Sequence, residues 1–496
     1  MGCLSYKTKI KYLIIIFILY YACFLFHELW IEKDAAMYLL LAKSLAHEGK
    51  YVDNFLPVPK THTRIPPGYP FILSLVIRTF GDRLLFLRLP TLIFVGFSLI
   101  ILFKILSKYL PNKEIVLILV LIALNPFFLT LVHTINSDIL YLLLSWLGIF
   151  IFLDNEKYLN YKKTLLVTLI IIAGFYIKTN ICLYFSLAIY LLLRKRYRHF
   201  SLVILLGLTM LPWLIYALPK ADSYTQVFFT KDVYSQSHET IRALDIPWRF
   251  FLNLGYYVGK DLPDLLFYPY FKRITFGNLL FPVKIGLGLL FSFLFLQGFY
   301  FLSRRKFTLI EVYIFVYFTS ILFWPYHDER FLFPIYPFLL VYLIFSLSGK
   351  KTKPLGIPII LCLLAPVLIA NFQISQNLFS KKTFQKLALS EAYSWLKTNT
   401  SPAAIIMSRD CPGVYFYTMR KGLSLESKPT ITELKTKKID YILIEKETGL
   451  TSQGKKINDF DKYLKPLFEK YPNYFSLVYT SSAKPEVFVY RTNFLY

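Results

Sequence analysis

The chain has 496 residues, of which 56% are hydrophobic and 18% aromatic, and only 17% carry a charge. A soluble protein of this size has about 25% charged residues, so the composition excludes an ordinary soluble domain and predicts a polytopic α-helical membrane protein. The net charge of +26 does not indicate a nucleic acid partner, because the Lys and Arg residues gather in alternate loops between apolar runs.

A helix needs roughly 20 mostly apolar residues to cross a bilayer. Apolar runs of about this length recur along the chain and predict about eleven transmembrane helices. We expect them at 12–29, 88–106, 114–132, 138–153, 164–178, 181–193, 200–218, 283–302, 307–323, 331–348 and 354–373.

Every second loop between these runs is basic, and the loops in between are nearly free of Lys and Arg. The basic stretches precede the first run and then lie at 104–113, 157–163, 194–198, 303–306 and 349–353. Cytoplasmic loops carry this excess, and basic residues there meet anionic membrane lipids. We therefore expect a multi-pass protein of the inner (plasma) membrane with a cytoplasmic N-terminus, and with residues 30–87, 219–282 and 374–496 outside.

Two domains are expected: a transmembrane domain over 1–375 and a small extracytoplasmic α/β domain over 376–496. In the second, FQKLALSEAYSWLKTNT predicts an amphipathic helix and AAIIMS a buried strand. Thr432 is the expected N-cap of a further helix, and IDYILI is a second strand. After a last helix near 457–470, FSLVYTS and EVFVYRT predict a closing hairpin.

The first outer loop, 30–87, contains two unusual stretches. Asp34, Tyr38, Leu41 and Leu45 recur at helical spacing, so Asp34 is expected to begin a helix, where the helix dipole by itself favours an acid. Farther on, RIPPGYPFILSLVIRTFG bends sharply at its prolines before an irregular apolar segment. Such a turn is tolerated only where protein or water covers it, so we expect the loop to fold onto the membrane body.

The outer loop 219–282 is polar in its first half and aromatic in its second. Trp and Tyr favour the headgroup level, so the second half is expected along the membrane interface. Long loops often act as lids. The loop is therefore either a cover over a cleft or an ordinary connector.

Several motifs together resemble one known family. Asp34-x-x-x-Tyr38 with a following A-x-x-L-x-x-x-G, then PPGYP, FG and R-L-P, resembles the first outer loop of GT-C glycosyltransferases. The nearest group is that of the protein mannosyltransferases and aminoarabinose transferases. Asn136-Ser137-Asp138, GFYIKTN, YHDERFLFPIYP and the tail segment SEAYSWLKTNTSPAAIIMS agree with it.

The resemblance implies a GT-C fold and an inverting transfer of a sugar from a polyprenyl-phosphate carrier to a hydroxyl of a glycan, lipid or protein acceptor outside the membrane. It implies that Asp34 is the catalytic carboxylate, which takes the proton from that hydroxyl or orients it. Guanidinium and ammonium groups suit the phosphate of the leaving group. The expected substrate-binding residues are Tyr38, Arg64, Tyr69, Arg88, Asp138, Lys178, His327 and Arg330.

Some of these residues have structural alternatives. Arg88 and Lys178 lie at span ends, where long cationic side chains can reach the interface. Asp138 can serve as a helix N-terminal acid with Ser137 as its cap. His327, Asp328 and Glu329 are compatible with a solvated turn, whereas an Arg that opens an apolar span is costly and favours a functional role for Arg330.

A divalent metal is bound in some relatives by acids of the first two outer loops, and Asp34 and Asp138 are the matching candidates here. The chain departs from the family at Ala35, where relatives often have Glu, and at Ile65, where they have Lys; Arg64 is the neighbouring cation. No WWDYG-like segment occurs, which argues against an oligosaccharyltransferase.

Two other classes of function remain as alternatives. A lipid-linked glycan carrier or flippase would have polar residues along the interior of its spans, whereas this chain keeps its charges at the ends. A non-catalytic envelope scaffold would use the C-terminal domain to bind a partner. The sequence leaves the sugar, the acceptor and the oligomeric state open.

Overall fold

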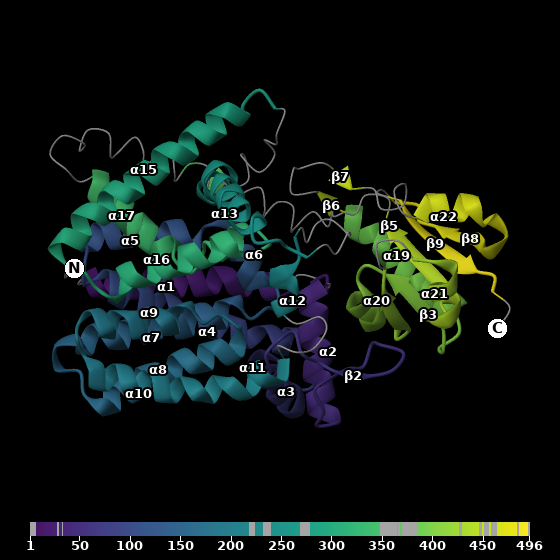
Figure 1. Cartoon of the computed structure of the whole chain (residues 1–496), viewed down its shortest axis with the longest axis horizontal. Coiled ribbons are helices and arrows are strands. Elements are labelled where there is room, and N and C mark those ends of the chain that lie inside the picture. Colours follow the sequence, from purple (N-terminus) through teal and green to yellow (C-terminus); the bar gives the residue numbers. More distant parts are fainter. Residues whose placement is uncertain are drawn as a thin grey trace.

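The computed structural model shows a bundle of helices with a smaller α/β domain at one end (Figure 1). It describes residues 6–26, 29–31, 33–217, 224–231, 240–267, 278–347, 365, 368–369, 384–425, 429–445, 449–450, 456–457, 464–483 and 486–494.

The bundle is built from apolar helices joined by short polar turns. In chain order its elements are α1 (Tyr6–Cys23), η1 (Phe24–Phe26), α4 (Leu84–Leu106), α5 (Asn112–Ala123), α6 (Pro126–His133), α7 (Asp138–Asn155), η2 (Glu156–Tyr158), α8 (Tyr161–Ile177), α9 (Cys182–Leu193), α10 (Tyr197–Gly207), η3 (Leu208–Met210), α11 (Leu211–Ala217), α15 (Phe281–Arg305), α16 (Leu309–Phe323) and α17 (Tyr336–Leu347).

The predicted α-helical membrane fold is confirmed, although fewer helices are of full spanning length than the expected spans. Among the described residues, five helices are long and apolar enough to cross a membrane, and α5 with α6 forms a sixth, bent by 58°. The runs expected at 181–193, 307–323 and 331–348 form the shorter apolar helices α9, α16 and α17. The run at 354–373 lies largely outside the described residues.

Close helix contacts in the bundle depend on small residues. A Cβ added to Gly298 of α15 would overlap the backbone carbonyl of Tyr342 in α17, so glycine allows these two helices to approach. Trp146 of α7 is fully buried, and its indole N–H donates to the carbonyl of Pro334 at 3.2 Å. A buried indole needs such a partner, and this one ties α7 to the turn before α17.

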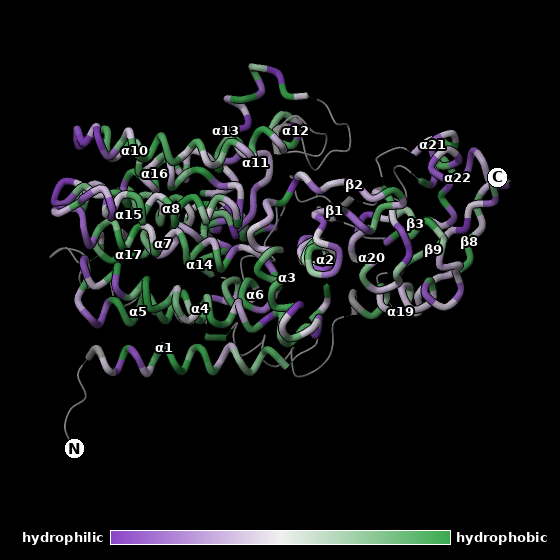
Figure 2. The backbone as a smooth tube through the Cα atoms, turned by 90° about the horizontal axis from the view of Figure 1, so that it is seen from below, coloured by the Kyte–Doolittle hydropathy of each residue, from purple (hydrophilic) through white to green (hydrophobic). Residues whose placement is uncertain are grey.

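The basic loops meet one another at one end of the bundle. Arg194 donates to the carbonyl of Phe307 at 2.6 Å, and Lys108 pairs with Asp154 at 2.8 Å. α1 begins at this end of the bundle, and the C-terminal domain lies at the other (Figure 1). Figure 2 shows apolar residues along the helices and hydrophilic ones gathered at the N-terminal end. Alternate loops therefore lie on opposite sides, as the charge pattern predicts.

The first outer loop contains α2 (Lys33–His47), the short antiparallel strands β1 (Val52–Asp53) and β2 (Lys60–Thr61), and α3 (Gly68–Phe80). α2 lies across the end of the bundle next to the C-terminal domain (Figure 1). A Cβ on Gly68 would lie 2.5 Å from the carbonyl of Tyr176 at the end of α8. The proline-bent segment is therefore held against the membrane body, as expected.

The outer loop 219–282 has a helical second half. The described part comprises α12 (Tyr224–Phe229), α13 (Asp245–Tyr256), the π-helical turn η4 (Tyr257–Asp261) and α14 (Leu262–Leu266). Asn253 of α13 donates to the carbonyls of Leu322 and Trp324, which anchors this helix to the end of α16. Whether the loop acts as a cover stays a prediction.

The C-terminal domain has a five-stranded sheet in the order β4-β3-β5-β9-β8. β3, β4 and β5 are parallel, and β9 and β8 continue the sheet antiparallel. Neighbouring residues of β3 face opposite sides of the sheet: Ile406 packs with α19 and α20, and Met407 with α21. The elements are α19 (Phe384–Asn399), β3 (Ile405–Ser408), α20 (Cys411–Thr418), β4 (Lys421–Ser424), α21 (Ile431–Thr436), β5 (Tyr441–Glu445), β6 (Gly449–Leu450), β7 (Lys456–Ile457), α22 (Lys465–Lys470), η8 (Pro472–Tyr474), β8 (Phe475–Thr480) and β9 (Val487–Thr492).

The helix at 384–399, the strands at 405–408 and 441–445, and the closing hairpin were all predicted from the sequence. The N-cap at Thr432 is wrong, because Thr430 caps α21 in a reciprocal capping box with Glu433. Neither α20 nor β4 was predicted from the sequence. Of the predicted helix at 457–470, residues 465–470 form α22 and 458–463 lie outside the described residues.

Candidate functional site

Asp34 lies in the first turn of α2, where the helix was expected to begin. Its Oδ2 is 3.5 Å from Nη1 of Arg330, and about half of its side chain (51%) is accessible. A carboxylate this accessible can still reach a ligand from solvent. The contact joins residues 296 positions apart in the sequence.

Tyr38 stands one turn farther along α2 and connects it to the start of α7. Its hydroxyl shares a 2.7 Å hydrogen bond with the hydroxyl of Ser137, and its ring meets the ring of Tyr69 edge-on at 5.0 Å. Ser137 is thus not the side-chain cap of α7, because its hydroxyl makes no capping bond; the amide oxygen of Asn136 accepts the N–H of Asp138 instead. This contact network fixes α2 against the bundle.

Asp138 and Lys178 form an ion pair between the start of α7 and the end of α8. Asp138 is buried and Lys178 is about one quarter accessible, at 24% of its side chain. The ammonium group also lies over the rings of Tyr141 and Phe331, at 5.9 and 5.7 Å from their centroids. Lys178 is therefore a cation held at the bundle end by a carboxylate and two aromatic faces.

Arg330 joins these groups from the turn η6 (Glu329–Phe331). Asp328 caps this turn by accepting the Arg330 N–H at 2.9 Å, and its Oδ2 lies 3.7 Å from the Arg330 Nε. Burial by itself lowers the pKa of Arg330, but the carboxylates of Asp138, Asp328 and Asp34 outweigh burial and raise that pKa. Arg330 is thus the cation shared by the acids of the site.

Three predicted residues lie apart from this group. Arg64 is exposed and forms no ion pair with another residue in the described part of the chain. Arg88 is buried, and its guanidinium donates to the carbonyls of Phe24 and Leu25 at 2.7 Å and to Nδ1 of His133 at 2.6 Å. It therefore binds the end of the first span rather than snorkelling.

His327 belongs to a second polar cluster. Its ring stacks on Tyr256 at 4.1 Å, and its Nδ1 is 3.8 Å from a carboxylate oxygen of Asp261. Burial, together with the charge of Lys260, lowers the pKa of His327 to about 4. The ring is therefore neutral at neutral pH.

Among the described residues, Asp261, Asp264 and Glu329 come nearest to a metal-binding arrangement. All three are buried, and one carboxylate oxygen of each lies within 4.8 Å of those of the other two. The Nζ of Lys260 lies 2.9, 3.5 and 3.9 Å from these three carboxylates. Lys284 pairs with Asp264 as well, at 2.5 Å. An ammonium group therefore occupies the place that a metal ion would take.

The predicted metal ligands, Asp34 and Asp138, each face a basic residue, Arg330 and Lys178. Mg²⁺ is usually held by one or two carboxylates together with water and substrate phosphates, so this pair of acids stays a prediction as a metal site.

The second cluster was not predicted from the sequence. Lys260, Asp261 and Asp264 stand in the segment YYVGKDLPDLLFY. Three charges at i, i+1 and i+4 inside an otherwise apolar and aromatic stretch were a signal that could have found it, because buried charges must be paired.

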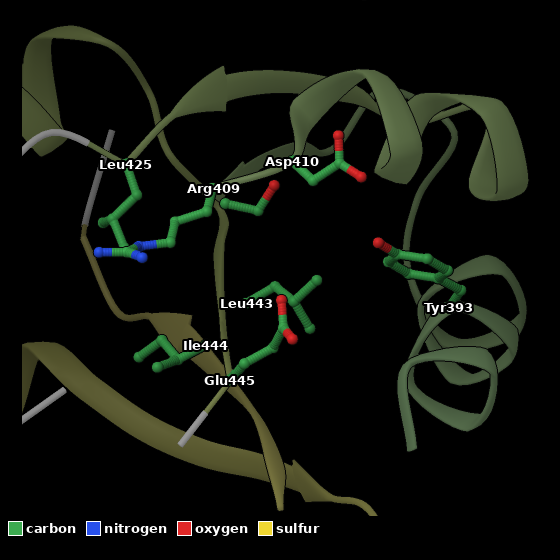
Figure 3. A pocket seen from close by; sticks show the side chains of 8 residues that line it. Tyr393, Arg409, Asp410, Leu425, Leu443, Ile444 and Glu445 are labelled. Carbon is green, nitrogen blue, oxygen red and sulfur yellow. The ribbon is translucent and has the colours of Figure 1, made fainter. Parts of the chain in front are cut away.

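A small hollow lies in the C-terminal domain at the carboxyl ends of β3 and β5 (Figure 3). Its polar lining comes from Tyr393, Ser408, Arg409, Asp410 and Glu445. In sheets with parallel strands, this edge is the usual place for ligand-binding residues.

Comparison with known proteins agrees with this architecture. Residues 64–220, about a third of the chain, match the model of the dolichyl-phosphate-mannose-protein mannosyltransferase family. The structure of ArnT from Cupriavidus metallidurans bound to undecaprenyl phosphate superposes with a TM-score of 0.58 at 10% identity, covering 97% of this chain and 98% of that one. The chain has the GT-C glycosyltransferase fold.

A second GT-C protein is similar over most of its length. The oligosaccharyltransferase of Archaeoglobus fulgidus, tethered to an acceptor peptide, gives a TM-score of 0.53 at 12% identity, with 97% of this chain and 74% of that one covered. No curated protein sequence matches the chain. The family resemblance predicted from the first outer loop is thus confirmed by the fold and by the match over residues 64–220.

Proposed function

We propose that this protein is an inverting glycosyltransferase that moves a sugar from a polyprenyl-phosphate carrier to an acceptor hydroxyl on the extracytoplasmic side of the membrane. One observation carries the proposal. The accessible carboxylate of Asp34 lies 3.5 Å from Arg330, and Arg330 in turn interacts with Asp138, the partner of Lys178. A base and two cations thus meet where the bundle adjoins the C-terminal domain.

In the proposed reaction, the acceptor oxygen bonds to the anomeric carbon from the face opposite the phosphate. The bond between that carbon and the phosphate oxygen breaks, and its electron pair leaves with the polyprenyl phosphate. Asp34 accepts the hydroxyl proton, which is worth roughly 10²–10⁴ in rate. Lys178 and Arg330 stabilise the charge that grows on the leaving phosphate.

The comparisons support the type of donor. The ArnT structure is bound to undecaprenyl phosphate, and the archaeal oligosaccharyltransferase is tethered to an acceptor peptide. By analogy, we propose that the carrier lipid enters sideways from the bilayer and places its phosphate beside Lys178. The proposal includes an inner-membrane location with the C-terminal domain outside, and leaves the sugar and the acceptor open.

Tyr38 and Tyr69 complete the proposed site, because the two rings contact each other and the Tyr38 hydroxyl meets Ser137 at the start of α7. Arg64 stays a prediction as a further phosphate contact. We assign Arg88 and His327 to the support of the site, since the first binds carbonyls and the second lies in the buried cluster around Lys260.

The test replaces Asp34 by Asn and by Ala in purified protein and follows transfer of labelled sugar from its polyprenyl phosphate to acceptors in membrane extracts. Asp82→Asn is the matched control, since Asp82 is an acid of the same loop that pairs with Lys43 at 2.8 Å. We expect the rate of sugar transfer to fall by a factor of roughly 10²–10⁴ in the Asp34 variants and to stay unchanged in the control. Undiminished transfer by Asp34→Ala would refute the catalytic assignment.

The same assay separates the rival functions. A flippase has no compartments to connect in detergent micelles, and a scaffold has no turnover, so neither yields a transferred sugar there. Mass spectrometry of envelope glycolipids and glycoproteins, with and without the chain, identifies the acceptor.

A further inference from the structure

One carboxylate of the C-terminal domain caps two helices at once. Asp410 stands between β3 and α20, and its Oδ1 accepts the N–H of Gly413 in the first turn of α20 at 3.1 Å. Both of its oxygens also lie 3.1 Å from the N–H of Lys33, the first residue of α2. A negative charge is favoured at each helix N-terminus. Asp410 therefore holds the start of a helix that lies 377 residues earlier in the chain.

The backbone that Asp410 holds is strained. Lys33 has φ = 48°, in the left-handed region, which residues with a Cβ rarely adopt. Lys33 directly precedes Asp34, so its backbone conformation sets the direction in which α2 begins and in which the Asp34 carboxylate points. A strained residue persists only where its surroundings determine it.

The surroundings of Lys33 come largely from α20. The hydroxyl of Tyr417 accepts the N–H of Ile31 at 2.7 Å, and the Tyr417 ring stacks on Trp30 at 4.7 Å. At Gly413, a Cβ would overlap the Asp410 carboxylate, so glycine allows that carboxylate to reach its place. Residues 30, 31 and 33 are thus all fixed by the C-terminal domain.

We propose that Asp410 is a positioning residue for sugar transfer: it holds Lys33 in the left-handed conformation and thereby aims the Asp34 carboxylate at the acceptor hydroxyl. The inference rests on the function proposed for Asp34. The C-terminal domain then contributes a positioning residue to the catalytic site. A change in how this domain contacts α2 therefore changes kcat.

The primary test is Asp410→Ala, assayed for transfer with the labelled donor. We expect kcat to fall about tenfold, which is the population lost when Lys33 relaxes from the left-handed region, and KM for the donor to stay unchanged. Asp410→Asn keeps an acceptor oxygen for the Lys33 N–H and should retain most of the activity. Lys33→Gly, in the Asp410→Ala background, should recover most of the loss, because glycine adopts positive φ without strain.

Two further variants separate positioning from general disruption. Lys33→Pro lies outside the C-terminal domain, removes the N–H and forbids positive φ, so it should match the loss of Asp410→Ala. Lys421→Met removes another hydrogen bond between the same two parts, from the Lys421 ammonium to the carbonyl of Asn54, and should leave kcat unchanged.

Hydrogen exchange gives a readout that does not depend on activity. The amides of residues 33–36 should exchange faster in Asp410→Ala than in the wild-type chain and in Lys421→Met. The inference is overturned if Asp410→Ala keeps a normal kcat and exchange rate, if Lys421→Met loses as much activity, or if Lys33→Gly recovers nothing. Absence of transfer by the wild-type chain would instead overturn the proposed function itself.

Discussion

Replacing Arg88 by leucine should destabilise the bundle, although the sequence places this residue among the phosphate-binding candidates. Its guanidinium is buried and donates to the carbonyls of Phe24 and Leu25 and to the ring of His133. Each buried acceptor left without a donor costs about 1–3 kcal/mol. Two carbonyls therefore cost roughly 2–6 kcal/mol, and leucine recovers part of that by burying apolar surface. We expect a net loss of about 3 kcal/mol.

The assay is thermal unfolding of purified variants in one detergent, with binding of polyprenyl phosphate measured on the same samples. Lys43→Leu is the control, because Lys43 pairs with Asp82 at 2.8 Å where both side chains are accessible, at 33% and 57%. Such pairs contribute under about 1 kcal/mol. The reasoning is refuted if Arg88→Leu unfolds like the wild-type chain while its phosphate binding falls, since Arg88 would then contact the ligand.

Three other changes have defined expectations. Lys178→Met should lower kcat for transfer at least about tenfold, because the leaving phosphate loses a cation; equal activity in the labelled-donor assay would contradict this. Lys260→Met leaves buried carboxylates uncompensated and should destabilise the protein by about 3 kcal/mol in thermal unfolding, and Asp261→Asn in the same background should restore part of the loss. Thr430→Ala should cost the C-terminal domain about 1 kcal/mol, measured by its denaturation midpoint, whereas the same change at Thr432 should cost little; the reverse order would contradict the observed cap.

Local patterns in the sequence predicted the helices and strands whose formation depends mainly on neighbouring residues. Apolar runs predicted the bundle helices, and the spacing of Asp34 and Tyr38 predicted the start of α2, which begins at Lys33. Alternation of apolar residues predicted the closing hairpin, found as β8 and β9. The misplaced cap at Thr432 shows the limit of such patterns, since two threonines two residues apart both fit the motif and only the backbone geometry selects Thr430.

The arrangement of the candidate site depends on contacts that local patterns do not contain. Arg88 and Lys178 look alike in the sequence, as single cations at span ends. In the folded chain, Lys178 pairs with Asp138 at the bundle end, whereas Arg88 donates hydrogen bonds to carbonyls at the end of the first span. Which cation faces a substrate is decided by the partners that distant helices bring to it.

The sequence by itself determined the membrane class, the two-sided topology, the α/β tail and the resemblance that singles out Asp34, because hydropathy, charge bias and motif spacing are properties of short segments. Only the tertiary structure decided that Arg330 stands beside Asp34, that Lys260 fills a cage of buried acids, and that Asp410 caps the helix on which Asp34 lies. The contacts of Arg330 with Asp34 and of Asp410 with Lys33 join residues 296 and 377 positions apart, and Glu329 reaches Lys260 from a distant turn. Their geometry follows from how helices and sheet pack together.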